Sequence, residues 1–228
     1  MSSLGIQKAK DEAVEWALTH GVAFKESLYS AVHTPFTLAP TPISRRDYQH
    51  LKSAAQTLSK LIYAVSEDHG FLYDAVHPIT AGDPFFSALL NMHQQIHSSA
   101  TKAPRLPLLI MRSDFMDDKR DGHKLVEFNG IAAGMGPFGQ RIHELHHYLQ
   151  RQWPAAYMQE SHQAMGELVS NYAIEGLSAG IAEATFKIKR EFGDTGPARF
   201  LMIVQEHENN VFDQHLLELA LQQRGIET

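Results

Sequence analysis

The chain has 228 residues, 43% of them hydrophobic and 20% charged, a balance typical of globular proteins. It contains no cysteine, which excludes disulfides and thiolate metal sites, and its net charge of −6 argues against nonspecific nucleic-acid binding. No apolar run approaches the roughly 18 to 20 residues that span a bilayer, and the N-terminus lacks the apolar core of a secretory signal, so we expect a cytoplasmic protein that binds no membrane.

The first elements are a helix and an extended segment. Residues 6–20 place apolar side chains near the helical period, and Gly21 follows as a stop signal. The three prolines between His33 and Pro42 forbid a helix there and favour an extended chain.

Two further helices are predicted before residue 100. One spans about 45–67, after a possible cap at Ser44, and the other spans 84–98, where Pro84 follows Asp83. Apolar residues at helical spacing in the second helix are expected to face inward. They are Phe85, Leu89, Met92 and Ile96.

The middle of the chain has the pattern of a hairpin. The short apolar segments Leu106–Met111 and Lys124–Phe128 are separated by a turn signal at Asp118–Gly122, which predicts two antiparallel strands. A glycine-rich loop, GIAAGMGPFG, follows Asn129 directly. Its glycines allow backbone N–H groups to approach an anionic ligand closely.

The last third combines helices with one buried strand. Helices are predicted at about 139–152, 166–191 and 212–224, and Pro154 separates the first two. Arg199–Gln205 has the composition of a fully buried strand. A buried strand followed by a helix opens a βαβ unit, which needs a parallel neighbour, and the sequence ends where that neighbour should begin.

These elements predict an α/β chain. Its N-terminal part is mostly helical with a small antiparallel strand pair, and the first βα unit of a parallel sheet follows. Gly193–Pro197 is typical of a linker. We therefore expect one domain over residues 1–192 and the incomplete start of a second over residues 198–228.

Three polar segments are candidates for chemistry. Arg112, at the end of an apolar run, offers a bidentate fork to a carboxylate or phosphate, or pairs with Asp114 or Glu127. Strand alternation places Glu127 and Asn129 on one face, where two oxygen donors suit Mg²⁺. The alternative there is a solvent-facing strand edge with a flexible turn.

The third segment follows the predicted buried strand. Ligands of open α/β sheets bind at the carboxyl ends of strands, and Glu208, Asn210 and Gln214 are concentrated there. Asn209 or Asn210 also has the chemistry to cap the next helix, and both roles are compatible.

A zinc site is the competing interpretation. His143-Glu-Leu-His-His147 matches H-E-x-x-H, in which two histidines bind zinc and the glutamate acts as base. Such a site also needs a third ligand, for which Glu160, His162 and Glu175 are arbitrary candidates. With 14 histidines in the chain, the pattern can also arise by chance on an ordinary amphipathic helix.

Several segments together resemble eukaryotic glutathione synthetases, most closely the fungal members. They are Glu12-Ala-Val-Glu-Trp16, Pro35-Phe-Thr-Leu38, Asp83-Pro-Phe85, Arg112-Ser-Asp-Phe-Met116, Val126-Glu-Phe-Asn-Gly-Ile131 and Glu208-Asn-Asn-Val-Phe-Asp-Gln214. The resemblance covers nearly the whole chain and implies the N-terminal portion of that family's ATP-grasp architecture. It also implies a cytoplasmic ligase, a homodimer at full length, that joins γ-glutamylcysteine to glycine with ATP and Mg²⁺.

The resemblance assigns roles to individual residues. Glu127 and Met116 would contact ATP, and Glu127 and Asn129 would bind Mg²⁺. The dipeptide site would comprise Arg112, Ile131, Ala132, Ala133, Gly134, Glu208, Asn209, Asn210 and Gln214.

The sequence also departs from the family pattern. Gly130, Ala132 and Gly134 replace hydroxyl residues of the family, and Asn209 stands where an arginine is usual. The family's glycine-rich phosphate loop and nucleotide lysines are expected in a part that this sequence lacks. We therefore expect a glutathione synthetase chain that is incomplete for turnover, or a shortened relative that binds a thiol peptide or the full enzyme without catalysis.

Overall fold

The computed structural model describes residues 3–97, 106–131, 133–161 and 166–228. The chain forms two compact units: unit 1 comprises Met1–Ser44 and Ile131–Thr228, and unit 2 is the continuous segment Arg45–Gly130. Among the described residues, no helix has both the length and the apolar composition needed to cross a bilayer. The domain boundary predicted at residues 193–197 lies within unit 1 and stays a prediction.

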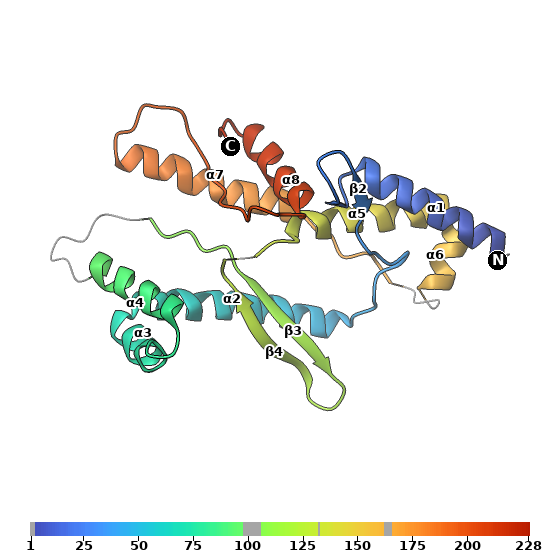
Figure 1. The fold of residues 1–228 in the computed structure, drawn as a ribbon. Helices are drawn as coiled ribbons and strands as arrows, with labels where there is room; N and C mark the ends of the chain where they lie inside the picture. Colours follow the sequence, from blue (N-terminus) through green and yellow to red (C-terminus); the bar gives the residue numbers. More distant parts are fainter. Residues whose placement is uncertain (1–2, 98–105, 132, 162–165) are drawn as a thin grey trace. The chain divides into compact units, whose positions relative to one another are not determined.

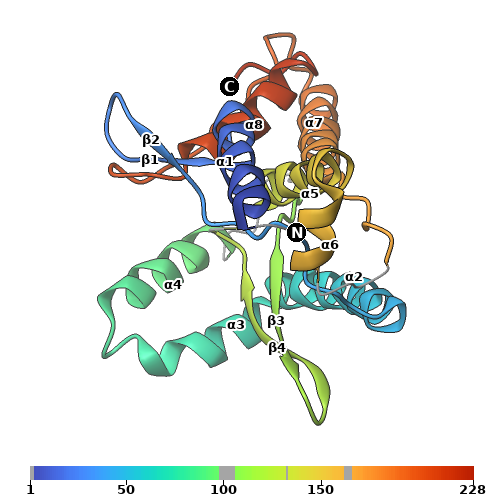
Figure 2. The same cartoon turned by 90° about the vertical axis from the view of Figure 1, so that its right-hand side faces the viewer.

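Unit 1 is a group of helices around α5, with a short antiparallel pair of strands (Figure 1). In Figure 2, α5 lies between α1 and α7. The elements are α1 (Ser3–Thr19), β1 (Ala23–Lys25), β2 (Ala31–His33), α5 (Gly136–Gln152), α6 (Pro154–Glu160), α7 (Ala173–Glu191) and α8 (Val211–Gln222).

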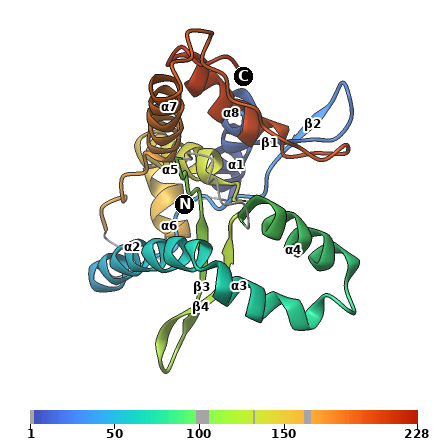
Figure 3. The same cartoon turned by 90° about the vertical axis from the view of Figure 1, so that its left-hand side faces the viewer.

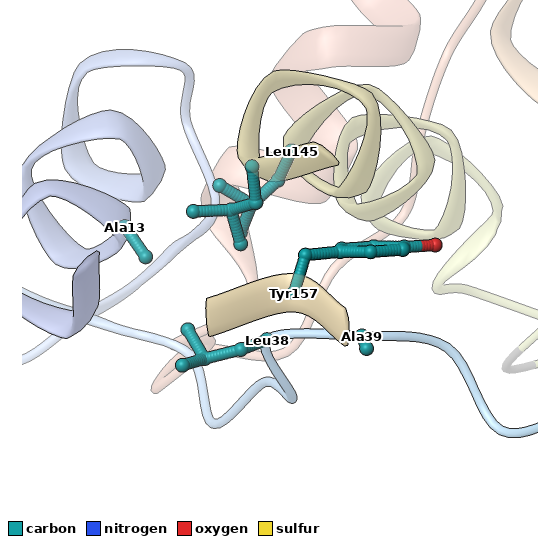
Figure 4. Packing of buried hydrophobic residues seen from close by; sticks show 6 residues of the cluster. Ala13, Leu38, Ala39, Leu145 and Tyr157 are labelled. Atoms are coloured by element: carbon teal, nitrogen blue, oxygen red, sulfur yellow. The ribbon is translucent and has the colours of Figure 1, made fainter. Parts of the chain in front are cut away.

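The core of unit 1 depends on close packing of α1 against α5. Ala9, Ala13 and Ala17 are completely buried, and their spacing of four residues places them on one face of α1. Small side chains on that face allow the neighbouring backbone to approach closely, and Leu145 of α5 projects toward Ala13 (Figure 4). Tyr157 of α6 completes the same cluster.

A carboxylate joins α1 to the end of α5. Oε2 of Glu12 accepts hydrogen bonds from the hydroxyl of Tyr148 and from Nε1 of Trp153, both at 2.8 Å. The bonds from Trp153 and then Tyr148 lower the pKa of Glu12 below its ordinary value. Glu12 belongs to one of the segments on which the family resemblance rests, and these two hydrogen bonds give it a structural role in unit 1.

Glu12→Gln tests this contact through its pH dependence. A lowered pKa in the folded state gives a stabilisation that is present above the ordinary pKa of glutamate and is lost as the pH falls through the lowered value. The difference in unfolding free energy between wild type and Glu12→Gln should therefore shrink in urea titrations from about pH 6 to about pH 3. Glu15→Gln, on the exposed side of α1, is the matched control and should change the unfolding free energy at pH 7 by less than about 0.5 kcal/mol. A pH-independent difference for Glu12→Gln would contradict the interpretation.

Unit 2 contains helices and one hairpin. The turn from α3 through the short helix η1 to α4 is visible in Figure 3. Asp83 caps α4, since its Oδ1 accepts a hydrogen bond from the Phe85 N–H at 2.8 Å. The elements are α2 (Arg45–Glu67), α3 (His69–Val76), η1 (His77–Ile79), α4 (Pro84–His97), β3 (Arg112–Asp118) and β4 (Gly122–Asn129).

Two predictions in unit 2 were wrong in detail. The hairpin is antiparallel as expected, but its first strand is Arg112–Asp118 rather than residues 106–111, because pairing starts at the turn, with Asp118 opposite Gly122. The apolar stripe of α4 does not face inward. Its members are 41–62% exposed, and Leu90 is instead the buried residue of α4. Leu90 shares a helix face with His93, whose ring contacts His69 of α3.

The C-terminal βα unit was also predicted only in part. Helix α8 forms, and α7 begins at Ala173 rather than near residue 166. Residues 200–205 form no strand, and Leu201 and Ile203 are more than 80% exposed. A parallel strand needs neighbours for its hydrogen bonds, and among the described residues only a parallel bridge between Arg199 and Glu227 supplies one. The parallel sheet of the predicted fold class is therefore limited to this bridge.

Candidate functional site

The hairpin of unit 2 gathers four polar side chains on one face. Its register places Arg112 opposite Asn129 and Asp114 opposite Glu127. Residues directly opposite one another in an antiparallel pair share a face, as do residues two apart along a strand. Glu127 and Asn129 are thus together, as alternation predicts, and Nδ2 of Asn129 lies 3.1 Å from Oε1 of Glu127.

Arg112 is paired with Asp114. The guanidinium donates from Nε to Oδ1 at 2.7 Å and from Nη2 to Oδ2 at 2.9 Å, a bidentate geometry. Asn129 also donates to Oδ2 of Asp114, at 3.0 Å. The ion pair that the sequence offered as an alternative for Arg112 is therefore present, and the same fork has the shape that a ligand carboxylate requires.

This face of the hairpin carries both carboxylates and a guanidinium, which suits the binding of a metal cation next to an anionic ligand. The hydrogen bond with Arg112, more than any other contact, lowers the pKa of Asp114 and keeps it ionised, while the same bond raises the pKa of Arg112. The carboxylates of Asp114 and Glu127 with the amide of Asn129 are hard oxygen donors, which Mg²⁺ prefers. Met116, further along β3, is 66% exposed.

A second group of the expected residues lies in unit 1, around the glycine-rich loop and the start of α8. A side-chain carbon at Gly134 would lie 3.4 Å from both Nδ2 of Asn210 and Oδ2 of Asp213, so the loop passes close to α8. Ile131 is 97% exposed, Ala133 is half-buried, and Ala132 lies outside the described residues.

Asp213 fixes this loop to α8. Its buried carboxylate accepts hydrogen bonds from the Met135 N–H at 2.8 Å and from the Phe138 N–H at 2.9 Å. These groups lie at the N-terminus of α5, where unpaired donors and the helix dipole favour a negative charge. The bonds hold Met135 in a left-handed backbone conformation with φ of 76°. Sequence reasoning missed this role, since the partner of Asp213 is far along the chain.

Most of the predicted site residues of segment 208–214 are joined to one another by hydrogen bonds. Glu208 accepts hydrogen bonds from the Asn210 N–H at 2.8 Å and from Nε2 of Gln214 at 3.1 Å. Asn210 occupies the N-cap position of α8, but its side chain makes no capping hydrogen bond, and its Oδ1 is buried without a hydrogen-bond partner. The side chain of Asn209 is exposed, and its carbonyl accepts a hydrogen bond from the Lys25 N–H.

The H-E-x-x-H segment lines a separate cavity of about 340 Å³ in unit 1. The rings of His143 and His147 are 4.5 Å apart, and burial lowers the pKa of His143. Glu144, the expected base of the motif, accepts a hydrogen bond from Arg141. Glu175, one of the candidate third ligands, accepts a hydrogen bond from Gln140. Within the described ranges these groups do not assemble three metal ligands, and the candidate ligand His162 lies outside them.

Comparisons with known proteins agree on one family. The family model described as "Eukaryotic glutathione synthase, ATP binding domain" matches residues 5–194, and the one described as "Eukaryotic glutathione synthase" matches residues 198–228. Human glutathione synthetase is 29% identical over 230 residues, covering 97% of this chain and 46% of the human protein. The Xenopus laevis enzyme is 27% identical over 223 residues, covering 94% of this chain and 44% of its own length.

A plant relative and a solved structure extend the comparison. The chloroplastic glutathione synthetase of Solanum lycopersicum is 28% identical over 229 residues, covering 96% of this chain and 40% of its own length. The structure of a glutathione synthetase-like effector from Globodera pallida, in its apo form, matches with a TM-score of 0.65 and 21% identity, covering 96% of this chain and 46% of the effector chain. This chain spans less than half the length of these relatives. The expected closeness to fungal members stays a prediction.

Proposed function

Because the chain belongs to the eukaryotic glutathione synthase family, we propose that it supplies the dipeptide-binding surface and part of the Mg²⁺–ATP site of a glutathione synthetase-type ligase. In that reaction the γ-phosphoryl group of ATP passes to the carboxylate of γ-glutamylcysteine, giving an acyl phosphate and ADP. The amine of glycine then attacks the acyl carbon and releases phosphate. A homodimer and a cytoplasmic location are part of the same proposal.

The dipeptide assignment depends mainly on Asn210, which lies beside Gly134 of the glycine-rich loop. Its Oδ1 atom is buried and has no hydrogen-bond partner. A buried acceptor without a partner costs free energy, which a ligand N–H would recover by donating to it. A γ-glutamyl dipeptide carries both an ammonium and an amide N–H that can serve as this donor. Gly134, with no side chain, lets the loop pass close to Asn210 and to Asp213 at the start of α8.

On the hairpin, the proposal assigns the anion to Arg112 and the metal to Glu127 and Asn129. The fork of Arg112 that holds Asp114 has the geometry for a substrate carboxylate. The donors of Glu127 and Asn129 fit Mg²⁺ by type, and the ion would neutralise phosphate charge during transfer. Met116 is proposed to contact the nucleotide.

Calorimetric titration with γ-glutamylcysteine tests the binding surface. Arg112→Ala and Asn210→Ala should each weaken binding by about 10-fold, because each removes a hydrogen bond to a charged or otherwise unpaired group. Arg120→Ala, at the exposed tip of the same hairpin, is the matched control and should bind like wild type. Two results would refute the dipeptide site. One is the absence of heat when wild type is titrated with about 1 mM ligand, and the other is that Arg112→Ala and Asn210→Ala bind the dipeptide as tightly as the Arg120→Ala control.

A ligase assay with ATP, glycine and the dipeptide separates the family activity from binding alone. Dipeptide binding without turnover would favour the alternative role, a protein that binds the thiol peptide or the full-length enzyme without catalysis. Turnover by the chain alone would show that these residues suffice for the reaction, against the expectation that it is incomplete.

A further inference from the structure

Three histidines converge between two helices of unit 2. His69 is the first residue of α3, whereas His93 and His97 are four residues apart on α4 and therefore lie on one face. The ring of His69 stacks on that of His97 with centroids 4.0 Å apart, and it meets His93 edge-on at 5.0 Å. One ring nitrogen from each histidine lies within 4.8 Å of the other two.

Two of these rings contain buried nitrogens without partners. Nδ1 of His69 and Nε2 of His93 are both inaccessible to solvent and make no hydrogen bond. Buried polar atoms are nearly always paired, so two in one cluster require an explanation. Burial, and then the nearby His69, lowers the pKa of His93, which favours the neutral ring whose lone pair can bind a metal.

We propose that His69, His93 and His97 bind a divalent first-row transition-metal ion, with Zn²⁺ as a tetrahedral occupant and water or another ligand in the fourth position. Zn–N bonds of about 2.0–2.1 Å place tetrahedral ligand nitrogens about 3.3 Å apart. The nitrogens of the cluster lie within 4.8 Å, so side-chain rotations suffice to close the remaining distance. Imidazole ligands suit zinc, copper and nickel, whereas Mg²⁺ prefers oxygen.

The expected effect of the metal is to join α3 to α4. In unit 2 the described residues of α2 and α3 include none that is buried, and in α4 only Leu90 is buried. Helices with so little buried surface gain little stability from packing. An ion that binds the folded arrangement and not the unfolded chain stabilises it by mass action, so the site would compensate for the sparse core.

The test titrates Zn²⁺ into the chelator-treated full chain and follows heat and thermal unfolding. Wild type should bind one equivalent and unfold at a higher temperature with the metal. His93→Ala and His97→Ala should each weaken binding by about 100-fold or more and abolish the temperature increase. Mg²⁺ should neither bind at this site nor displace Zn²⁺. A visible spectrum of tetrahedral Co²⁺, lost in His97→Ala, would support the proposal directly.

Two control variants distinguish this cluster from the other histidines of the chain. His50→Ala removes an exposed histidine from α2 and should leave Zn²⁺ binding unchanged. His147→Ala should do the same; if instead it removes the bound zinc, the metal belongs to the H-E-x-x-H segment and the proposal is overturned. Circular dichroism at 25 °C establishes that each variant is folded, and His97→Gln, a polar substitution, repeats the test if His97→Ala does not fold. No zinc binding by folded wild type would also overturn the proposal.

Discussion

Replacing Asp213 with alanine is expected to destabilise unit 1 by about 3 to 4 kcal/mol, because two backbone N–H groups at the start of α5 lose a charged acceptor. The Phe138 N–H is buried, so water cannot replace the carboxylate there without a change in the fold. The substitution also removes a negative charge from a helix N-terminus. Urea unfolding followed by circular dichroism measures the loss.

Asp213→Asn is the matched comparison. It keeps one acceptor oxygen and the shape of the side chain, but it loses the charge and one of the two hydrogen bonds, so about half of the destabilisation is expected. The same variants should weaken dipeptide binding, since Asp213 holds the loop that contains Gly134 next to Asn210. A loss below about 1 kcal/mol in Asp213→Ala would mean that the loop and α5 do not depend on this carboxylate.

Leu145→Ala is expected to cost about 3 kcal/mol through the cavity that it leaves between α1, α5 and α6. Leu145 is completely buried, and the small side chain of Ala13 opposite it cannot expand to fill the space. Unfolding free energies from urea titration test the value, with Leu145→Met expected to cost less than about 1.5 kcal/mol because volume is nearly conserved.

Leu219→Ala provides the control for Leu145. Leu219 lies on α8 with 54% of its surface exposed, so its truncation should cost less than about 1 kcal/mol. Equal losses at the two positions would contradict the core described here. Since Leu145 is also the third residue of the H-E-x-x-H segment, the result would show that part of this motif serves packing.

Local signals predicted the helices well and the contacts between elements poorly. Gly21 ends α1, and Asp83 with Pro84 starts α4, because caps and breakers act within a few residues. The buried face of α4 was wrong, since periodicity identifies an apolar stripe but not the surface that covers it. Residues 200–205 formed no strand because strand formation depends on neighbours that a local pattern does not supply.

In the candidate site, too, local signals predicted neighbours within one strand but not contacts between distant segments. Alternation along one strand was enough to place Glu127 beside Asn129. The proximity of Gly134 to Asn210 and Asp213 joins segments more than 70 residues apart, and nothing in their local sequence indicates it. The cluster formed by His69 with His93 and His97 was missed for the same reason, because the helix that carries the pair gives no sign of its partner.

The division of unit 1 into two separated segments has a consequence for synthesis of the chain. Residues 1–44 are translated before unit 2, yet α1 packs on α5, which is translated only after the whole of unit 2. Contacts between distant parts of a chain form slowly, whereas a continuous segment can fold as soon as it is complete. Translation should therefore present unit 2 before unit 1 can close, with the alanine face of α1 uncovered until α5 has been translated.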